Sequence, residues 1–268
     1  MTVVPRSAPD KGGSSTGDVT FIAFLTDDGQ RIDQGLVWRV YPDQSGTNDA
    51  KPKLIGNWRD ASPTVKLPPG NYIVNAAFGR AHLTRKIKVE AGVAAQERFV
   101  LNAGGLRVTA MAGSETAPDR SVSYDILSGD TDQLGNRTRI MSNARPGVIV
   151  RLNAGIYHII STYGDANAVV KADVTVEAGK LTEATINHQG ARVTFKLVTR
   201  TGGEAQADTQ WSVQNANGES VKESVGALPT HILEPGSYVV NAKHGGRSFQ
   251  RSFTVRPNEA AQIEVVMQ

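Results

Sequence analysis

Histidines are the side chains in this sequence best suited to act as general bases or metal ligands. The chain has five of them, at His82, His158, His188, His231 and His244. None belongs to an H-x-x-x-H or H-E-x-x-H pair, which would bring two ligands to one zinc ion. Nucleophilic catalysis needs a serine or threonine beside a histidine that a carboxylate orients. Scattered histidines are expected, whereas a histidine and a carboxylate meeting in a pocket would favour an enzyme.

Paired carboxylates could also do acid–base chemistry, as they do in glycosidases. The candidates are Asp27-Asp28-Gly29 and Asp130-Thr131-Asp132. Both are better explained as hairpin turns, in which Asp and Gly are favoured. Calcium is a second possibility for the Asp130 loop, which lacks the ligand spacing of an EF-hand, and Asn136-Arg137-Thr138 matches a short glycosylation pattern. We predict a non-enzymatic protein with no catalytic residue, no metal site and no cofactor.

Composition narrows the possible partners. The absence of cysteine excludes disulfides, thiolate metal sites and cysteine nucleophiles. The net charge is only +3, and the densest basic cluster, Arg85, Lys86 and Lys88, is interpreted as a solvated strand face, so nucleic acid is not an expected partner. No apolar run is long enough to span a bilayer. Residues 1–18 lack an apolar signal core and are expected to form a flexible polar tether, with any signal or anchor absent.

The elements that position these residues are repeated three times. The phrase L-x-x-G-x-Y-x-[VI] has its leucine, glycine and tyrosine at Leu67, Gly70 and Tyr72, at Leu152, Gly155 and Tyr157, and at Leu233, Gly236 and Tyr238; in the second unit His158 directly follows the tyrosine. A second glycine follows each tyrosine by seven residues, at Gly79, Gly164 and Gly245, which predicts a hairpin turn. An aromatic strand precedes each phrase, centred on Trp38, Tyr124 and Trp211. His158 occupies a position where the other units have isoleucine or valine, which argues against a catalytic role.

Alternation of apolar and polar residues predicts β-strands throughout and little helix. The alternation is clearest at 191–197, and each unit opens with such a strand. We predict an all-β protein of three tandem antiparallel β-sandwiches covering residues 19–104, 105–189 and 190–268. The units are joined almost without linkers, so the sequence predicts a semi-rigid rod.

The repeated residues have structural explanations. The leucine is expected to fill the core at a strand end, and the glycine to adopt a turn conformation closed to other residues. The tyrosine is expected to bury its ring while its hydroxyl binds the backbone, as in the tyrosine corner of Greek-key sandwiches. Trp38, Tyr124 and Trp211 are expected to fill the space between two sheets. The alternative is that these aromatic residues form a platform on which carbohydrate stacks.

The order of a strand, an aromatic strand, the repeated phrase, a glycine turn and a closing hairpin resembles the prealbumin-like sandwich repeats, the carboxypeptidase-regulatory-like and Cna B-type or Ig-like group. The resemblance covers residues 19–268 and implies the stalks, spacers and adhesion modules of bacterial envelope proteins. Some Cna B-type domains form an isopeptide bond between a lysine of the first strand and an asparagine or aspartate of the last. The opening strands of the first two units lack lysine, and Lys196 of the third has no such partner in 262–267. We therefore predict no cross-link.

The first strand of the first unit differs from its counterparts, because it is apolar on both faces. Ile22 and Phe24 lie on the side where the other units have polar residues. Exposed apolar residues on a strand near a sheet edge promote association, so something is expected to cover them. We favour the loop from Tyr41 to Trp58, with Trp58 as the covering side chain, and a partner protein is the alternative. Ile22, Phe24 and Trp58 are the candidate interaction residues.

The function expected from these features is that of a periplasmic or surface protein of a bacterium. Its three sandwiches would act as a spacer and a protein-interaction surface, with another envelope protein as partner. The first alternative is a carbohydrate- or peptidoglycan-binding module, with a cell-wall glycan as ligand. The second is an enzyme or an accessory domain of one.

Overall fold

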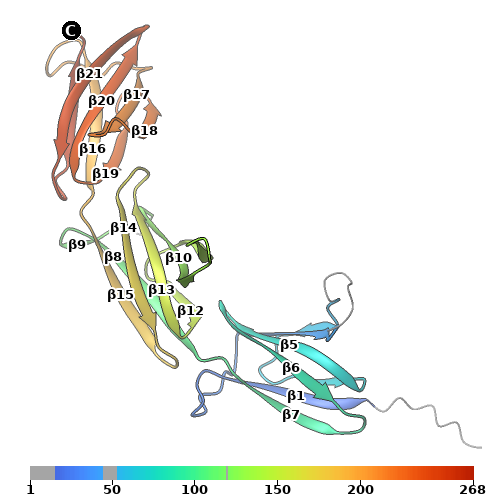
Figure 1. Ribbon diagram of the computed structural model, residues 1–268. Coiled ribbons are helices and arrows are strands. Elements are labelled where there is room, and N and C mark those ends of the chain that lie inside the picture. The colour runs from blue at the N-terminus through green and yellow to red at the C-terminus, as the bar shows by residue number, and fades with distance from the viewer. Residues whose placement is uncertain (1–15, 45–52, 119) are drawn as a thin grey trace, which may run out of the picture. The chain divides into compact units, whose positions relative to one another are not determined.

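The computed structural model describes residues 16–44, 53–118 and 120–268. Over these residues the chain is all-β and contains no helix, as the sequence predicts, so none that could cross a membrane is present in this part. Six sheets form three β-sandwiches in tandem (Figure 1). Residues 1–15 of the expected tether and residues 45–52 of the loop expected to cover Ile22 and Phe24 lie outside the described residues.

The three sandwiches share one plan of strands. The first consists of β1 (Gly17–Phe24), β2 (Leu36–Pro42), β3 (Gly56–Trp58), β4 (Thr64–Leu67), β5 (Gly70–Phe78), β6 (Ala81–Val89) and β7 (Ala94–Val100). The second consists of β8 (Ala103–Ala112), β9 (Glu115–Thr116), β10 (Val122–Thr131), β11 (Arg137–Ala144), β12 (Ile149–Asn153), β13 (Gly155–Tyr163), β14 (Val169–Val176) and β15 (Leu181–His188). The third consists of β16 (Ala191–Val198), β17 (Gln210–Asn215), β18 (Ser220–Val225), β19 (Thr230–Leu233), β20 (Gly236–His244), β21 (Arg247–Val255) and β22 (Ala261–Val266).

In each sandwich the opening strand forms the middle of a small sheet, and the aromatic strand belongs to the facing sheet. The small sheets have the orders β4-β1-β7, β12-β8-β15 and β19-β16-β22. The facing sheets have the orders β3-β2-β5-β6, β11-β10-β13-β14 and β18-β17-β20-β21. Two strands of the facing sheet are therefore joined by the hairpin that follows the repeated tyrosine.

The antiparallel prediction needs one correction. The closing strand runs parallel to the opening strand in the first and third sandwiches, where β7 pairs with β1 and β22 pairs with β16. A tight turn requires antiparallel neighbours, but these strands are separated by the whole of the intervening sandwich. The long connection through the facing sheet permits parallel pairing.

The core forms because apolar side chains alternate along the strands. Val19, Phe21 and Ala23 of β1 are buried and alternate with half-buried residues. The ring of Phe21 stacks on Trp38 with centroids 5.3 Å apart, and Phe195 stacks on Trp211 at 5.6 Å. All three repeat leucines are buried as expected, at Leu67, Leu152 and Leu233.

The tyrosine corner is present in the first and third sandwiches. The hydroxyl of Tyr72 donates to the carbonyl oxygen of Pro68 at 2.7 Å, and that of Tyr238 donates to the carbonyl oxygen of Glu234 at 2.8 Å. The backbone conformation of the glycine two residues before each tyrosine differs between the units more than expected. Gly70 and Gly155 have φ of 159° and 155°, but Gly236 is not among the glycines with positive φ. A left-handed backbone therefore does not explain the glycine of the third unit.

The joints between sandwiches are short. β7 ends at Val100 and β8 begins at Ala103, while β15 ends at His188 and β16 begins at Ala191. The second and third sandwiches together form one compact unit that contains Leu106–Ile149, Gly155–Val176 and Leu181–Gln268. The contacts at the joint within this unit are specific and are described next.

Candidate functional site

A turn of the second sandwich docks on the third. The turn joins β13 to β14 and contains Asp165 and Asn167. The side-chain nitrogen of Asn167 donates to the hydroxyl of Tyr238 at 2.9 Å, and its side-chain oxygen accepts the backbone N–H of Glu234 at 3.2 Å. The repeated tyrosine of the third sandwich is thus hydrogen-bonded both to its own corner and to its neighbour.

Asp165 supplies the charged part of this joint. Its carboxylate lies 3.0 Å from Nδ1 of His231 and 2.9 Å from Nζ of Lys222, and its carbonyl oxygen accepts a bond from the same ammonium at 3.1 Å. The side chain of His231 is only 6% exposed, whereas that of Asp165 is half exposed. Partial burial opposes ionisation of the carboxyl, but the hydrogen bonds and charges of Lys222 and His231 outweigh it and hold the pKa of Asp165 below its ordinary value.

The apolar part of the joint depends on close packing. Tyr163 and Ala168, on either side of the docking turn, form one buried cluster with Ile232 of β19. Gly164 has a φ of 78°, and a Cβ at this position would lie 2.5 Å from side-chain atoms of Ile232. The second glycine of the repeat therefore provides more than a hairpin turn in the second unit, because it also allows the neighbouring sandwich to approach.

His231 connects the joint to both sheets of the third sandwich. It lies on β19, and its Nε2 is 3.0 Å from Oγ of Ser224 on β18, in the facing sheet. Ser224, His231 and Asp165 thereby follow the hydrogen-bond order of a serine hydrolase triad. Two histidines meet a carboxylate, His231 at this joint and His158 on the surface of the second sandwich. Contrary to the expectation of scattered histidines, His231 and Asp165 both border a cavity of about 340 Å³.

The surroundings of this triad favour a structural role. Lys222 binds the same carboxylate as His231 and neutralises the charge that would stabilise a protonated imidazole during catalysis. Arg120 and Arg192 also line the cavity beside Asp165. Ser224 lies within a regular strand and is directly paired with Trp211. The chain of hydrogen bonds therefore ties two sheets and a neighbouring sandwich together.

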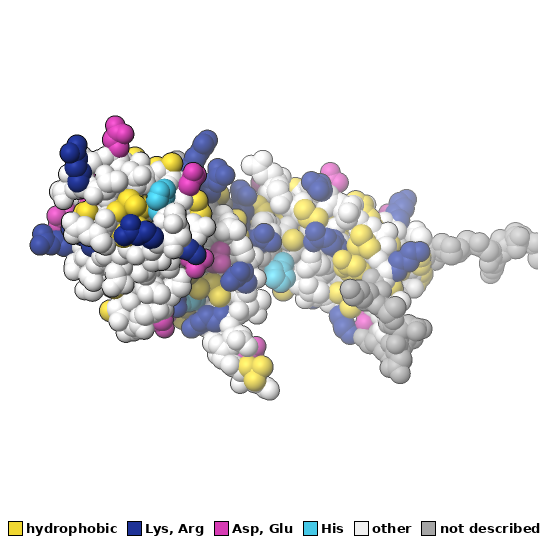
Figure 2. All heavy atoms as spheres, turned by 90° about the horizontal axis from the view of Figure 1, so that it is seen from above, with side chains coloured by type: hydrophobic (Ala, Val, Ile, Leu, Met, Phe, Trp, Pro, Cys, Tyr) yellow, Lys and Arg dark blue, Asp and Glu magenta, His cyan; other side chains and the backbone are white. Residues whose placement is uncertain are grey.

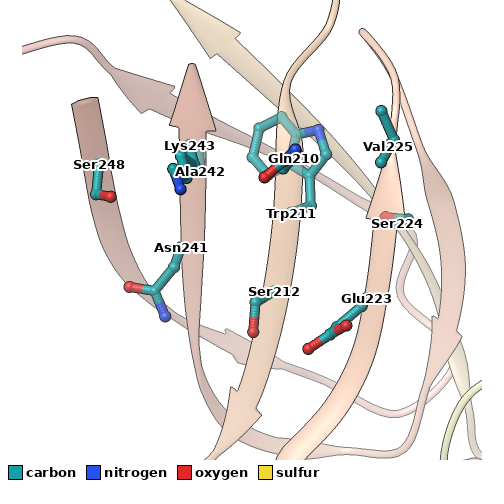
Figure 3. Close-up of a pocket in the computed structure, with 10 residues that line it drawn as sticks. All are labelled: Gln210, Trp211, Ser212, Glu223, Ser224, Val225, Asn241, Ala242, Lys243 and Ser248. Atoms are coloured by element: carbon teal, nitrogen blue, oxygen red, sulfur yellow. The ribbon is translucent and has the colours of Figure 1, made fainter. Parts of the chain in front are cut away.

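A groove of about 540 Å³ lies on the β18-β17-β20-β21 sheet (Figure 3). Its lining residues come from four adjacent strands and are Gln210, Trp211, Ser212, Glu223, Ser224, Val225, Asn241, Ala242, Lys243 and Ser248. Two cross-strand rows organise it, one through Ser212 and Asn241 and the other through Gln210 and Lys243. Trp211 and Ala242 alternate with these residues and are buried, so they face the core.

The other residues with possible chemistry are separate from this region. Nδ1 of His158 is 2.7 Å from Asp173 on the surface of the second sandwich, and Nε2 of His188 is 2.9 Å from Oγ of Ser161 in its core. Burial lowers the pKa of His188. His82 lies on β6 of the first sandwich, and His244 is the last residue of β20 in the third. No group of His, Asp or Glu among the described residues has a geometry that could hold a metal ion.

Asp27 and Asp28 lie in a turn, as predicted, whereas Asp130 belongs to the end of β10 and only Asp132 lies in the connection to β11. Asp132 accepts the backbone N–H groups of Leu134 and Asn136 at 2.9 and 2.8 Å. The bond from Asn136 is the main reason that the pKa of Asp132 lies below its ordinary value. Asp27 binds Arg98, and Asp28 accepts a hydrogen bond from the hydroxyl of Thr26. These carboxylates organise local structure.

Ile22 and Phe24 are half buried on the outer side of β1. The guanidinium of Arg98 lies 4.5 Å from the centroid of the Phe24 ring, and Arg98 is the cross-strand neighbour of Ile22. Trp58 is on β3 of the facing sheet, directly opposite Trp38, and packs against the core. The hypothesis that Trp58 covers Ile22 and Phe24 is therefore wrong, because the sandwich core separates them; Arg98 supplies part of the cover.

The repeated aromatic residues cannot form a carbohydrate platform. Trp38 and Tyr124 are fully buried and Trp211 is 2% exposed, so no ring face is available to a sugar. The indole N–H of Trp211 donates to the carbonyl oxygen of Gly226 at 2.8 Å. The prediction that these residues fill the space between sheets is confirmed, and any glycan site must be elsewhere.

Ion pairs are found at the lysine considered for a cross-link and in the basic cluster considered for nucleic-acid binding. Lys196 lies 3.5 Å from the carboxylate of Glu264 on the closing strand, as an ion pair at the position considered for a cross-link. The three cations of the densest basic cluster each have an acidic partner, in the pairs Arg85–Glu97, Lys86–Asp43 and Lys88–Glu90. On the face shown in Figure 2, Lys and Arg side chains are scattered, with acidic side chains among them.

Sequence reasoning missed Asp165 and Asn167 of the joint and Ser212 of the groove, although differences between units mark them. The second glycine is followed by Asp165, Ala166 and Asn167 only in the second unit. The residue after the repeated aromatic is Arg39, Asp125 or Ser212. Both differences could have been found by comparing the units position by position.

Comparison with known proteins relates the third sandwich to a described family. Residues 192–267 match the Rhizobiales growth-associated tandem repeat domain. No curated protein gives a significant match in sequence.

Several solved structures are similar at low identity. They include the Bacillus anthracis TIE protein (15% identity, 94% of this chain and 50% of that chain, TM-score 0.26). They also include the minor pilin GBS52 of Streptococcus agalactiae (14%, 64% and 95%, TM-score 0.34) and a streptococcal ancillary pilin (12%, 94% and 99%, TM-score 0.31). This chain spans half the length of the TIE protein, and TM-scores this low do not establish a shared fold.

Proposed function

We propose that this protein is a non-enzymatic component of a bacterial cell envelope, periplasmic or on the surface, in which tandem β-sandwiches act as a spacer and as a protein-interaction module. The observation that carries the spacer role is the docking of Asp165 and Asn167 on the third sandwich. A spacer must resist bending at its joints, and a joint with an apolar cluster, an ion pair and two side-chain bonds restricts that motion.

Other features support the envelope setting. The matched family is described as growth-associated and belongs to Rhizobiales, which supports a role in a growing bacterial cell. The chain contains no cysteine, a composition common among envelope proteins. The Lys222 contact with Asp165 supports a structural role for the Ser224–His231 pair instead of hydrolysis.

The test of the spacer role is a distance distribution measured in the full chain. Because no native cysteine is present, spin labels on Ser142→Cys and Ser252→Cys are unique probes of the second and third sandwiches. We expect a narrow distribution in this background and a broad one after Asp165→Ala with Asn167→Ala. Asp173→Ala, which breaks an exposed pair within the second sandwich, is the control and should leave the distribution narrow. A broad distribution before any of these changes would contradict the spacer role.

The interaction role is tested at Ile22 and Phe24, the half-buried apolar pair on β1. The full chain is used as bait in envelope extracts, beside a variant with Ile22→Lys and Phe24→Lys and a control with Ser252→Lys. We expect an envelope protein that the control retains and the double variant loses, with unchanged melting temperatures. Equal recovery would remove this surface from the proposal.

A further inference from the structure

The groove on the third sandwich contains an unusual set of polar side chains. Gln210, Ser212, Asn241 and Ser248 are uncharged, and Glu223 and Lys243 carry opposite charges. None of these six side chains has a hydrogen-bond or ion-pair partner among the described residues. Their donors and acceptors are therefore available to a ligand.

On the corresponding face of the first sandwich, the polar side chains bind one another. Ser212 and Asn241 are cross-strand neighbours on β17 and β20, as Arg39 and Asn75 are on β2 and β5. In the first sandwich Arg39 donates to Asn75 at 3.3 Å, and Asn75 donates to Thr84 at 2.9 Å. The third sandwich has the short Ser212 at the position of Arg39. Asn241 therefore has no arginine to bind, and a groove is left in the surface.

The second sandwich also fills this position. Asp125 follows Tyr124 as Ser212 follows Trp211. Its carboxylate accepts the backbone N–H of Asn143 at 2.9 Å and lies 3.5 Å from Arg139. Of the equivalent residues Arg39, Asp125 and Ser212, only Ser212 has a small side chain. The groove of about 540 Å³ is found on its sandwich, the third.

We infer that this groove binds an uncharged oligosaccharide. Its carboxamides and hydroxyls can both donate and accept, as sugar hydroxyls require. The negative charge of Glu223 and the positive charge of Lys243 cancel, which disfavours a strongly charged ligand. The exposed Val225 provides an apolar contact at the side, suited to the carbon face or the acetamido methyl of a sugar.

The size and place of the groove favour a sugar over a protein segment. Its volume falls in the range of small-ligand sites, roughly 300–1,000 Å³. The two rows of side chains run across four strands. A peptide that added to the sheet would instead lie along an edge strand and use its backbone groups. The spacer role depends instead on Asp165 and Asn167 of the joint, which do not line this groove.

The test is an NMR titration of the full chain labelled with nitrogen-15. The probes are the trimer of N-acetylglucosamine, the β-1,4-linked trimer of glucose and an uncharged hexapeptide. We expect either sugar to shift amide signals of β17, β18, β20 and β21, with millimolar affinity because no aromatic face is exposed in the groove. No shift with either sugar, shifts confined to other sandwiches, or an equal response to the peptide would overturn the assignment.

Two variants locate the binding in the groove. Ser212→Arg installs the residue that the first sandwich carries at this position and fills the groove, so it should weaken binding by at least about tenfold, equivalent to one good hydrogen bond or more. Ser252→Arg adds the same side chain on exposed β21 outside the groove and should bind as the unchanged protein does. Asn241→Ala, which leaves the fold's core untouched, gives a second route if Ser212→Arg lowers the melting temperature. Binding that survives both groove variants would overturn the assignment.

Discussion

The carboxylate of Asp165 lies 3.0 Å from Nδ1 of His231, although the two residues are 66 positions apart and belong to different sandwiches. His231 also binds Ser224, so one imidazole connects both sheets of the third sandwich to a turn of the second. Lys222 completes the charge balance around the carboxylate. The charged part of the joint is thus built from side chains that the repeated phrase does not include, whereas Tyr238 of that phrase binds Asn167.

Tyr238 is expected to contribute more to stability than its counterpart Tyr72. Its hydroxyl binds both Glu234 and Asn167, whereas the bond from Tyr72 to Pro68 lies within one corner. Tyr72→Phe should lower the free energy of unfolding by about 1 kcal/mol and Tyr238→Phe by about 2 kcal/mol, since each lost bond is worth about 1 kcal/mol. Urea unfolding measures both. Equal losses would show that the bond to Asn167 contributes nothing.

Gly164 should tolerate alanine less well than Gly245. Both have positive φ, at 78° and 55°, so alanine is strained at either site. At Gly164 the new Cβ would also overlap Ile232 at 2.5 Å, while at Gly245 it would meet nothing within 4 Å. Gly245→Ala should cost roughly 1 kcal/mol and Gly164→Ala roughly 2–4 kcal/mol. Thermal unfolding compares them, and similar melting temperatures would contradict the close approach of β19.

His188 should make the protein sensitive to mild acid. Burial lowers its pKa below the ordinary value of 6.5, so in the range just below that pH the unfolded chain binds a proton that the folded chain does not. The free energy of unfolding therefore falls as the pH falls through this range. Ser161→Ala with His188→Leu, which removes both members of the buried pair, should reduce this dependence. Urea unfolding between pH 7.5 and pH 5 measures it.

The control for this measurement is Ser252→Ala, an exposed change on β21 that removes no titratable group and should retain the full dependence on pH. The contribution of Asp165 falls in a separate window. Its pKa is lowered on folding, so its stabilisation is present above its ordinary value of 3.8 and is lost as the pH falls below it. Identical pH profiles for the double variant and the unchanged protein would rule out His188 as the source.

Ser224 should not react with a fluorophosphonate probe of serine hydrolases. Its partner His231 binds a carboxylate that also forms an ion pair with Lys222, so this carboxylate is not reserved for orienting a catalytic imidazole. The measurement is labelling of the full chain at neutral pH, read by intact mass, with a known serine hydrolase as positive control. Labelling that His231→Ala abolishes would identify the protein as an enzyme.

Much of the fold could be predicted because it depends on local pattern. The spacing of leucine, glycine and tyrosine located the hairpins, and period-two alternation identified the strands. The burial of Trp38, Tyr124 and Trp211 also followed from their place in the repeat. The parallel pairing of β1 with β7 did not follow, because it depends on the path of the whole sandwich.

The candidate sites were harder to predict. Trp58 was expected at the end of a loop that covers Ile22 and Phe24, since no local signal shows that it belongs to a short strand of the facing sheet. The role of Arg98 over Phe24 was missed, because it results from pairing strands at opposite ends of the unit. The groove was missed because it forms where the side chain of Ser212 is short. Whether a short side chain leaves a groove depends on its neighbours on adjacent strands, which the sequence does not identify.

The sequence by itself determined that three similar all-β units follow one another and which residues fill their cores, because burial repeats at fixed spacing along a strand. Only the tertiary structure decided that Asp165 meets His231 and that Ser212, which is too short to replace Arg39, lies opposite Asn241. Such contacts join strands that are far apart in the chain, and their energies depend on distances of a few ångströms that the order of residues does not specify.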